Sequence, residues 1–260
     1  MFASQEALCR AALFISSVLS IGLSCCGFIA PALAKAPPSS VVHEPTRAVA
    51  PLPKLLARAH QRWRALAPHV ARGCERVGVR VHLTPRHEQS TQEAREADLA
   101  WLHQQFQEAN RLFTPLKVCF ELSELLTHPA SDAHMKTREQ RSSLGARGGF
   151  KRGVVELFIV DRLDDVDVAD TQIRGVHWRH PQAREARRWV ILSRVAQPLV
   201  LAHELGHYFS LPHGKDPYSI MNKTPRDIPY QERGFTVRER AKMRRAWRKM
   251  KRSAHLTPVL

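Results

Sequence analysis

Residues 199–213 of this 260-residue chain read LVLAHELGHYFSLPH. His203 and His207 are four positions apart, so on a helix their imidazoles lie on the same face, with Glu204 beside them. The surrounding residues are mostly apolar, which predicts that this helix is buried. Because burying polar groups without partners costs about 1–3 kcal/mol each, the three side chains indicate a binding site rather than an ordinary buried helix.

A third histidine, His213, follows His207 by six residues. The helix cannot continue through Pro212, whose ring removes the N–H and clashes with the preceding turn. The chain must therefore turn, and the turn can bring His213 back towards His203 and His207. Three histidines leave the fourth corner of a tetrahedral zinc site open, which is the catalytic rather than the structural arrangement. The alternative is a set of surface histidines on an amphipathic helix.

The spacing within residues 203–213 resembles HExxHxxGxxH, the signature of the metzincin zinc peptidases. Metzincins also carry a methionine turn downstream, and residues 218–222 (YSIMN) look like that turn. Met221 lies eight residues after His213, a spacing similar to that of the matrixin-like branch. The resemblance covers roughly residues 77–252.

This resemblance implies that His203, His207 and His213 hold one catalytic Zn²⁺, with Met221 as a structural floor and not a ligand. It also implies the hydrolysis of peptide bonds by a zinc-activated water. Glu204, as general base, would take a proton from that water and pass it to the leaving amine.

The chain departs from the family pattern in three places. Ser210 stands where the signature has glycine, at a helix end that needs an unusual backbone conformation, and a serine there is expected to cost about 1 kcal/mol of strain. Lys223 lies where some metzincins keep a zinc-facing tyrosine, for which Tyr218 and Tyr230 are candidate replacements. No segment matches the one that holds structural zinc and calcium in matrixins.

Outside this motif, hydrophobic periodicity predicts an α+β fold. Apolar residues at steps of three and four predict one helix over 92–113, and alternating residues predict a half-buried strand over 77–83. A long surface loop is expected over 127–152. Further strands are predicted at residues 117–122, 154–160, 173–178 and 189–193. This order fits a mixed sheet with helices packed on one face.

The metzincin resemblance makes this fold more specific. It implies a zincin-like mixed sheet with a long backing helix, an active-site helix, and a small C-terminal subdomain that ends in a helix. In metzincins an edge strand above the cleft aligns the peptide by strand addition, a role that the resemblance assigns to residues 173–178. His177 in that strand also fits an ordinary edge-strand residue.

The N-terminal sequence predicts export. Residues 11–30 are apolar or small, and Ala32 and Ala34 match the small-residue pattern of a signal-peptide cleavage site. The protein is therefore expected to be secreted or periplasmic. Because the preceding segment is poor in basic residues, an uncleaved N-terminal membrane anchor is one alternative, and a buried helix is the other. The expected domains are a signal peptide or anchor (1–34), a Pro-rich linker or short pro-segment (35–72) and a metzincin-like catalytic domain (73–260).

Cleavage of the leader would leave two cysteines, Cys74 and Cys119. An even pair in an exported protein favours a disulfide between them, and two buried free thiols are the alternative. Cys74 is also a candidate for a latency switch in which a thiolate binds the zinc, although its surroundings match no known switch sequence.

The chain has 40 Lys and Arg against 24 Asp and Glu, a formal net charge of +16. Nine of these positive residues lie in 236–252, a predicted helix that begins with a Thr236–Glu239 capping box and carries a narrow stripe of Met243, Trp247 and Met250. This helix either binds an anionic surface or polyanion, or docks through its stripe and leaves a solvated basic face. No specific nucleic-acid module is present.

The five aspartates between Asp161 and Asp170 form an acidic turn after the strand 154–160. Carboxylates from one turn can converge on a hard cation, so a calcium loop is weakly indicated, but no EF-hand spacing is present. Acidic turns are more often simply solvated.

Composition excludes a multi-pass membrane protein, because the chain has a single long apolar run. The leading functional hypothesis is an exported zinc metalloendopeptidase whose partner is a protein or peptide substrate. Two alternatives remain: a catalytically inactive, zinc-stabilised protein that binds a polyanion, and a cell-wall-directed zinc hydrolase.

Overall fold

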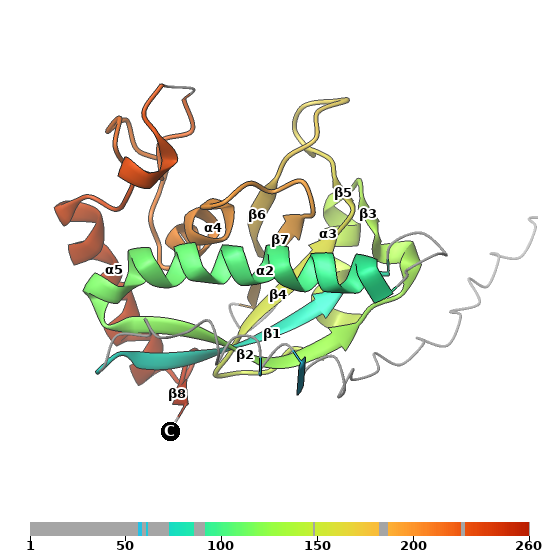
Figure 1. The fold of residues 1–260 in the computed structure, drawn as a ribbon, viewed down its shortest axis with the longest axis horizontal. Helices are drawn as coiled ribbons and strands as arrows, with labels where there is room; N and C mark the ends of the chain where they lie inside the picture. The colour runs from blue at the N-terminus through green and yellow to red at the C-terminus, as the bar shows by residue number, and fades with distance from the viewer. Residues whose placement is uncertain are drawn as a thin grey trace, which may run out of the picture. The chain divides into compact units, whose positions relative to one another are not determined.

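A six-stranded mixed sheet forms the centre of the fold (Figure 1). Its strands run in the order β2 (Val118–Thr127), β1 (Glu75–Leu83), β4 (Val155–Val160), β7 (Arg188–Ser193) and β6 (Gly175–Arg179). The first four are parallel, β6 is antiparallel to β7, and β8 (Pro258–Val259) pairs antiparallel with β1. A separate short pair joins β3 (His134–Met135) to β5 (Arg162–Leu163). The predicted α+β class and mixed sheet are confirmed.

The computed structural model describes residues 73–85, 92–147, 149–181, 187–224 and 227–259, together with residues 57, 58 and 61. These residues belong to one compact unit, Glu44–Leu260. The leader predicted for residues 1–34 lies outside the described residues, as does most of the segment 35–72. Among the helices of the described ranges, none is long and apolar enough to cross a membrane.

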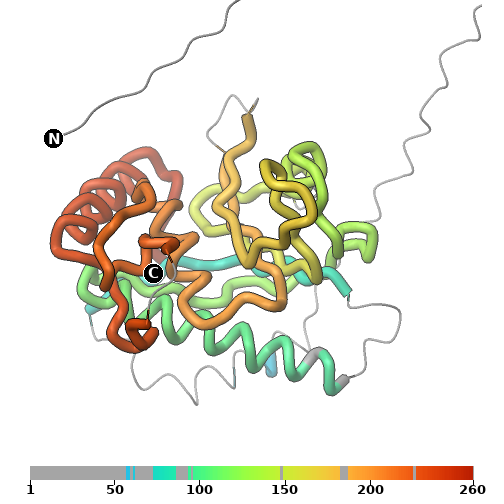
Figure 2. Tube along the Cα trace, turned by 90° about the horizontal axis from the view of Figure 1, so that it is seen from above, coloured from blue at the N-terminus to red at the C-terminus, as the bar shows by residue number. Residues whose placement is uncertain are grey.

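Helices cover both faces of the sheet. Along β4, Leu157 and Ile159 face the larger core, which also contains side chains of α2 (Gln92–Phe113), α4 (Val200–Tyr208) and α5 (Val237–Arg252). Phe158 and Val160 face a smaller core on the opposite side, with Leu144 of α3 (Arg138–Arg147). Figure 2 shows α2 and α3 on opposite sides of the sheet. The prediction that the helices pack on one face is therefore wrong.

The long helix α2 has the predicted bounds and the predicted buried stripe. The stripe residues Leu99, Leu102, Phe106, Ala109 and Phe113 are all buried in the larger core. A short 3₁₀ turn over Thr114–Leu116 follows at Pro115, because proline cannot continue the hydrogen-bond ladder. The stripe lies against the sheet and against α4, so α2 is the support behind the histidine helix.

The segment 127–152 is not the long loop that its polar composition suggested, because it contains β3 and α3. The side chain of Gln140 accepts hydrogen bonds from the N–H groups of Lys136 and Thr137, and the Thr137 hydroxyl accepts the N–H of Gln140. This reciprocal capping starts a helix that is polar apart from its anchor, Leu144, which is fully buried.

Strand β1 is buried on both faces, so the prediction of a half-buried strand is also wrong. Its two buried polar residues, Arg80 and His82, are paired inside the protein. Glu156 of β4 accepts from Arg80 Nη1 at 2.8 Å and from the backbone N–H of Lys151 at 2.9 Å, and its Oε2 lies 2.7 Å from Nε2 of His82. Burial lowers the pKa of His82, which favours a neutral ring that donates to Glu156.

The C-terminal helix α5 begins and packs as predicted. The Thr236–Glu239 capping box is present, and Met243, Trp247 and Met250 are buried. Glu75, at the start of β1, accepts hydrogen bonds from Trp247 Nε1 and Lys251 Nζ, each at 2.5 Å. These contacts fasten α5 beside the first strand.

Cys74 and Cys119 are joined by a disulfide, immediately beside the first pairs of β1 with β2. The thiol of Cys74 is therefore not free to act as the latency switch considered above. The bond ties the start of the central strand to its neighbour.

The acidic turn does not gather its carboxylates around one point. Three of them pair with separate side chains instead: Asp161 with Arg194, Asp164 with Arg162 and His134, and Asp167 with Arg138. Among the described residues, the group of metal-ligand side chains that comes together is His203, His207 and His213, not this turn. Within the described ranges, the carboxylates of this turn therefore do not form a group of three or more that could hold a metal ion.

Candidate metal centre

The histidine helix α4 is positioned by a buried glutamine of α2. Gln105 is 1% exposed, and its Oε1 accepts the N–H of Leu201 at 3.1 Å. Its Nε2 donates to the carbonyls of Ala196 and Gln197 at 3.1 and 2.9 Å. The Gln105 amide therefore hydrogen-bonds to two carbonyls before the helix and to one N–H group in its first turn. Backbone N–H groups of a first turn lack intrahelical partners. Nothing in the local sequence pattern marked Gln105 for this role.

The helix ends at Tyr208, two residues before the serine that departs from the metzincin pattern. Ser210 has φ of 70°, the left-handed conformation that favours glycine. The N–H of Leu211 returns to the Gly206 carbonyl at 3.0 Å, and that of Ser210 to the His207 carbonyl at 2.9 Å. The expected strain is therefore present, and the turn forms in spite of it.

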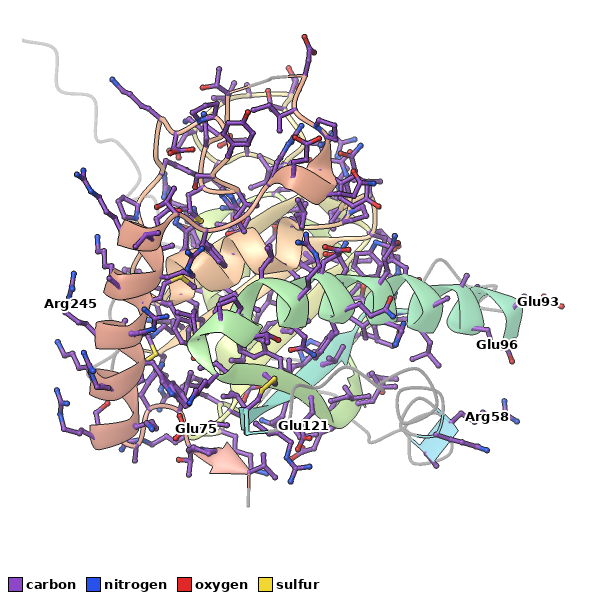
Figure 3. All side chains as sticks on the ribbon, turned by 60° about the vertical axis from the view of Figure 1, so that its left-hand side comes forward. Arg58, Glu75, Glu93, Glu96, Glu121 and Arg245 are labelled. Atoms are coloured by element: carbon purple, nitrogen blue, oxygen red, sulfur yellow. A yellow bond between two sulfur atoms is a disulfide. The ribbon has the colours of Figure 1, made fainter. Side chains whose placement is uncertain are left out.

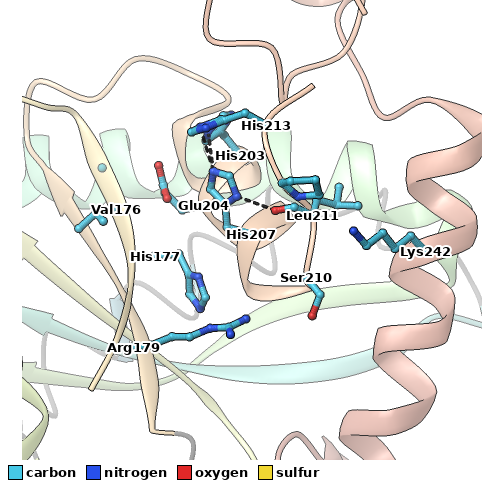
Figure 4. Close-up of a pocket in the computed structure, with 12 residues that line it drawn as sticks. Val176, His177, Arg179, His203, Glu204, His207, Ser210, Leu211, His213 and Lys242 are labelled. Carbon is cyan, nitrogen blue, oxygen red and sulfur yellow. Dashed lines mark hydrogen bonds between the residues drawn. The ribbon is translucent and has the colours of Figure 1, made fainter. Parts of the chain in front are cut away.

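The turn brings His213 back to the helix, as the sequence predicted. Nε2 of His207 lies 3.1 Å from Nε2 of His203 and 3.2 Å from Nε2 of His213 (Figure 4). His203 and His207 are partly buried, and His213 is exposed. The three side chains therefore present one nitrogen each to a common point.

Two of these rings are held in a fixed tautomer. Nδ1 of His203 lies 2.6 Å from the Ile220 carbonyl, and Nδ1 of His207 lies 2.7 Å from the Leu211 carbonyl. A carbonyl oxygen only accepts, so each Nδ1 carries the proton and each Nε2 presents a lone pair. Burial lowers the pKa of His207 and of His213, which favours the neutral rings that bind metals.

The donor set fits a tetrahedral metal ion. Lone pairs that face one another at 3.1–3.2 Å repel unless a cation or a proton lies between them. Two imidazole nitrogens bound to one tetrahedral zinc at about 2.0–2.1 Å are about 3.3–3.4 Å apart, close to the separations seen. A carbonyl partner on the second ring nitrogen is also typical of histidine ligands.

Glu204 lies beside this cluster and is buried, with 6% of its surface exposed. Burial raises the pKa of Glu204 to about 8, opposed by a hydrogen bond from the backbone N–H of His177 on β6. The close approach of β6 requires Gly175, because a Cβ there would lie 3.1 Å from Cγ of Glu204 and 2.8 Å from Val200. The edge strand and the carboxylate are therefore direct neighbours.

Met221 lies beneath the helix, fully buried. A Cβ on Gly206 would lie 2.6 Å from its sulfur. The turn around Met221 also reaches the histidines, since the Ile220 carbonyl accepts from His203 and the Met221 carbonyl accepts the N–H of Gly214. The turn around Met221 thus supports the histidine cluster from below.

We expect Gly206→Ala to lower the free energy of unfolding by about 1–3 kcal/mol, because the new methyl group would displace the Met221 sulfur in a filled core. Gly214→Ala is the matched control, since a Cβ there meets its nearest neighbour, Glu239, at an ordinary 3.4 Å. Urea unfolding of the metal-free proteins measures both changes. Equal stability of the two variants would contradict the tight contact.

The histidines and Glu204 open into a cavity of about 590 Å³. Its walls come from β6, from the end of α4 and from α5 (Figure 4). The lining residues are Gly175, Val176, His177, Arg179, His203, Glu204, His207, Ser210, Leu211, Pro212, His213 and Lys242. Sequence patterns gave no sign of Arg179 and Lys242, which come from distant segments. The candidate replacement tyrosines, Tyr218 and Tyr230, are exposed and do not line it.

Comparison with known proteins finds no family model that matches this chain and no match among curated proteins. The case for a function therefore rests on the site itself.

Proposed function

We propose that this protein is an exported zinc-dependent endopeptidase of metzincin type, with a zincin-like fold. His203, His207 and His213 are the proposed metal ligands, and Glu204 is the proposed general base. The observation that carries the proposal is the convergence of three imidazole nitrogens, with Nε2 of His207 at 3.1 Å from that of His203 and 3.2 Å from that of His213, next to a buried carboxylate. The motif resemblance and the methionine beneath the helix add support.

The chemistry divides between the metal and the chain. Zinc, when bound, acidifies water and polarises a carbonyl group. Glu204 is placed to serve as the base because its buried carboxylate lines the cavity beside the three histidines. The backbone N–H of His177 holds the carboxylate in place.

Strand β6 supplies a means of aligning a peptide. It is the last strand in the sheet order, so its outer edge has no strand partner among the described residues. Unpaired N–H and C=O groups of an edge strand can pair with an extended peptide. Since His177 of this strand reaches Glu204, a peptide added here would lie beside the proposed general base.

Export is supported by the disulfide between Cys74 and Cys119, a bond typical of oxidising compartments. A secreted or periplasmic location is therefore part of the proposal, with an N-terminal membrane anchor as the alternative.

The proposal is tested by metal analysis coupled to cleavage of a peptide library. Purified protein is expected to contain one zinc ion per chain and to cleave internal peptide bonds. A chelator should stop cleavage, and added zinc should restore it. Zinc-loaded protein that cleaves no peptide would contradict the peptidase proposal, and release of fragments from peptidoglycan but not from protein would identify a cell-wall hydrolase instead.

A further inference from the structure

Two cationic side chains from different elements line one end of the cavity. Arg179 is the last residue of β6, and Lys242 belongs to α5. Both line the cavity, and Figure 4 shows their side chains extending towards the space beside Ser210 from opposite sides. Neither makes a hydrogen bond or an ion pair with another side chain of the described part of the chain.

The rest of the lining leaves this positive charge uncompensated. Glu204 is the one acidic residue among the described residues that line the cavity, and it lies at the histidine cluster. His177 stands on the same wall as Arg179. An anionic group that enters the cavity would therefore be attracted to the end formed by Arg179 and Lys242.

Ser210 adds a hydroxyl group to the same end of the cavity. Its backbone is held at φ of 70°, a conformation that costs free energy for any residue except glycine. Strain of this kind is concentrated at functional sites. A serine here places an O–H donor between the two cations, which glycine would lack.

We infer that Arg179, Lys242 and Ser210 form a subsite for a carboxylate of the peptide substrate, next to the bond that is cut. The assignment of a substrate rests on the proposed function, but carboxylate binding can be measured without cleavage. Peptides carry carboxylates in two places: the side chain of Asp or Glu, and the free C-terminus. Both present the same planar anion, which accepts hydrogen bonds from guanidinium, ammonium and hydroxyl donors.

The test uses equilibrium binding to the zinc-loaded Glu204→Gln protein, so that the peptides are not consumed. Three peptides of equal length are compared: one with an internal Glu and an amidated C-terminus, one with Gln in its place, and one with Gln and a free C-terminal carboxylate directly after it. At low ionic strength, at least one carboxylate peptide is expected to bind about 5- to 10-fold more tightly than the neutral peptide, and salt should reduce the difference.

The preference should disappear in Arg179→Glu/Lys242→Glu and weaken in Arg179→Gln/Lys242→Gln, which keeps the protein closer to its native charge. The matched control is Arg245→Glu/Arg248→Glu. It makes the same change in the net charge of the protein, with both substitutions on α5. Neither residue lines the cavity, and Arg245 points away from the domain (Figure 3). The control should keep the preference.

The pattern across peptides identifies the carboxylate. Preference for the internal Glu indicates a side-chain subsite, and preference for the free C-terminus indicates recognition of the chain end. Equal binding of all three peptides, including no measurable binding of any, overturns the inference, as does equal loss in the control variant. Cleavage of the same peptides by the unaltered protein reports separately on the proposed function.

Discussion

Glu204→Gln is expected to reduce peptide cleavage by roughly 10²–10⁴-fold, the range usual for loss of a general base. Glutamine has nearly the same shape as glutamate, and its carbonyl oxygen can still accept the N–H of His177, but it cannot take up a proton. The three histidines are untouched, so zinc content should stay at one ion per chain. Initial rates on a cleaved peptide and metal analysis of the same preparation measure the two effects.

The variant is also expected to fold normally. A neutral amide is less costly to bury than a carboxylate, and Glu204 is 6% exposed. Glu232→Gln is the control, because Glu232 is an exposed carboxylate outside the cavity, and its cleavage rate should match that of the unaltered protein. Full activity in Glu204→Gln would remove Glu204 from the mechanism, and loss of zinc would show that its role is to hold the metal site.

The second large effect is expected in the core. Glu156→Ala should lower the free energy of unfolding by about 3–5 kcal/mol, because it leaves Arg80 and His82 buried without their shared carboxylate. Arg80 is 9% exposed and His82 fully buried. Arg80 keeps a hydrogen bond to Glu124. Within the described part of the chain, His82 would lose the partner of its Nε2, and its Nδ1 already has none. Urea unfolding with a fixed metal content measures the change.

A matched carboxylate lies on β2, on the other side of β1 from Glu156. Glu121 pairs with Arg76 at 3.4 Å, with both side chains substantially exposed. Exposed pairs contribute about 0–1 kcal/mol, so Glu121→Ala should change stability little. If the two alanine variants lose similar stability, the buried network around Glu156 is not important for the fold.

Sequence periodicity was sufficient to predict the elements whose structure is determined by contacts between residues close in the sequence. The apolar stripe of 92–113 and the capping box of 236–252 both predicted helices that the structure contains. The histidine spacing likewise predicted that His203, His207 and His213 would come together, because i, i+4 geometry and a proline that ends the helix are local constraints.

Local patterns failed where polar residues are satisfied by distant partners. Arg80 and His82 made β1 resemble a half-buried strand, but Glu156, on another strand, pairs with both inside the core. The polar segment 127–152 resembled a loop because one buried apolar side chain, Leu144, anchors α3. Arg179 and Lys242 meet only through the tertiary fold, so no spacing rule could have joined them.

The pairing of β1 also bears on how the chain folds. Glu75, at the start of that strand, receives its hydrogen bonds from residues 172 and 176 positions later, and Arg76 pairs with Val259. Contacts between such distant residues require the closure of long loops, which slows folding. During synthesis, the contacts at the start of β1 therefore cannot form until α5 and β8, near the end of the domain, have been made.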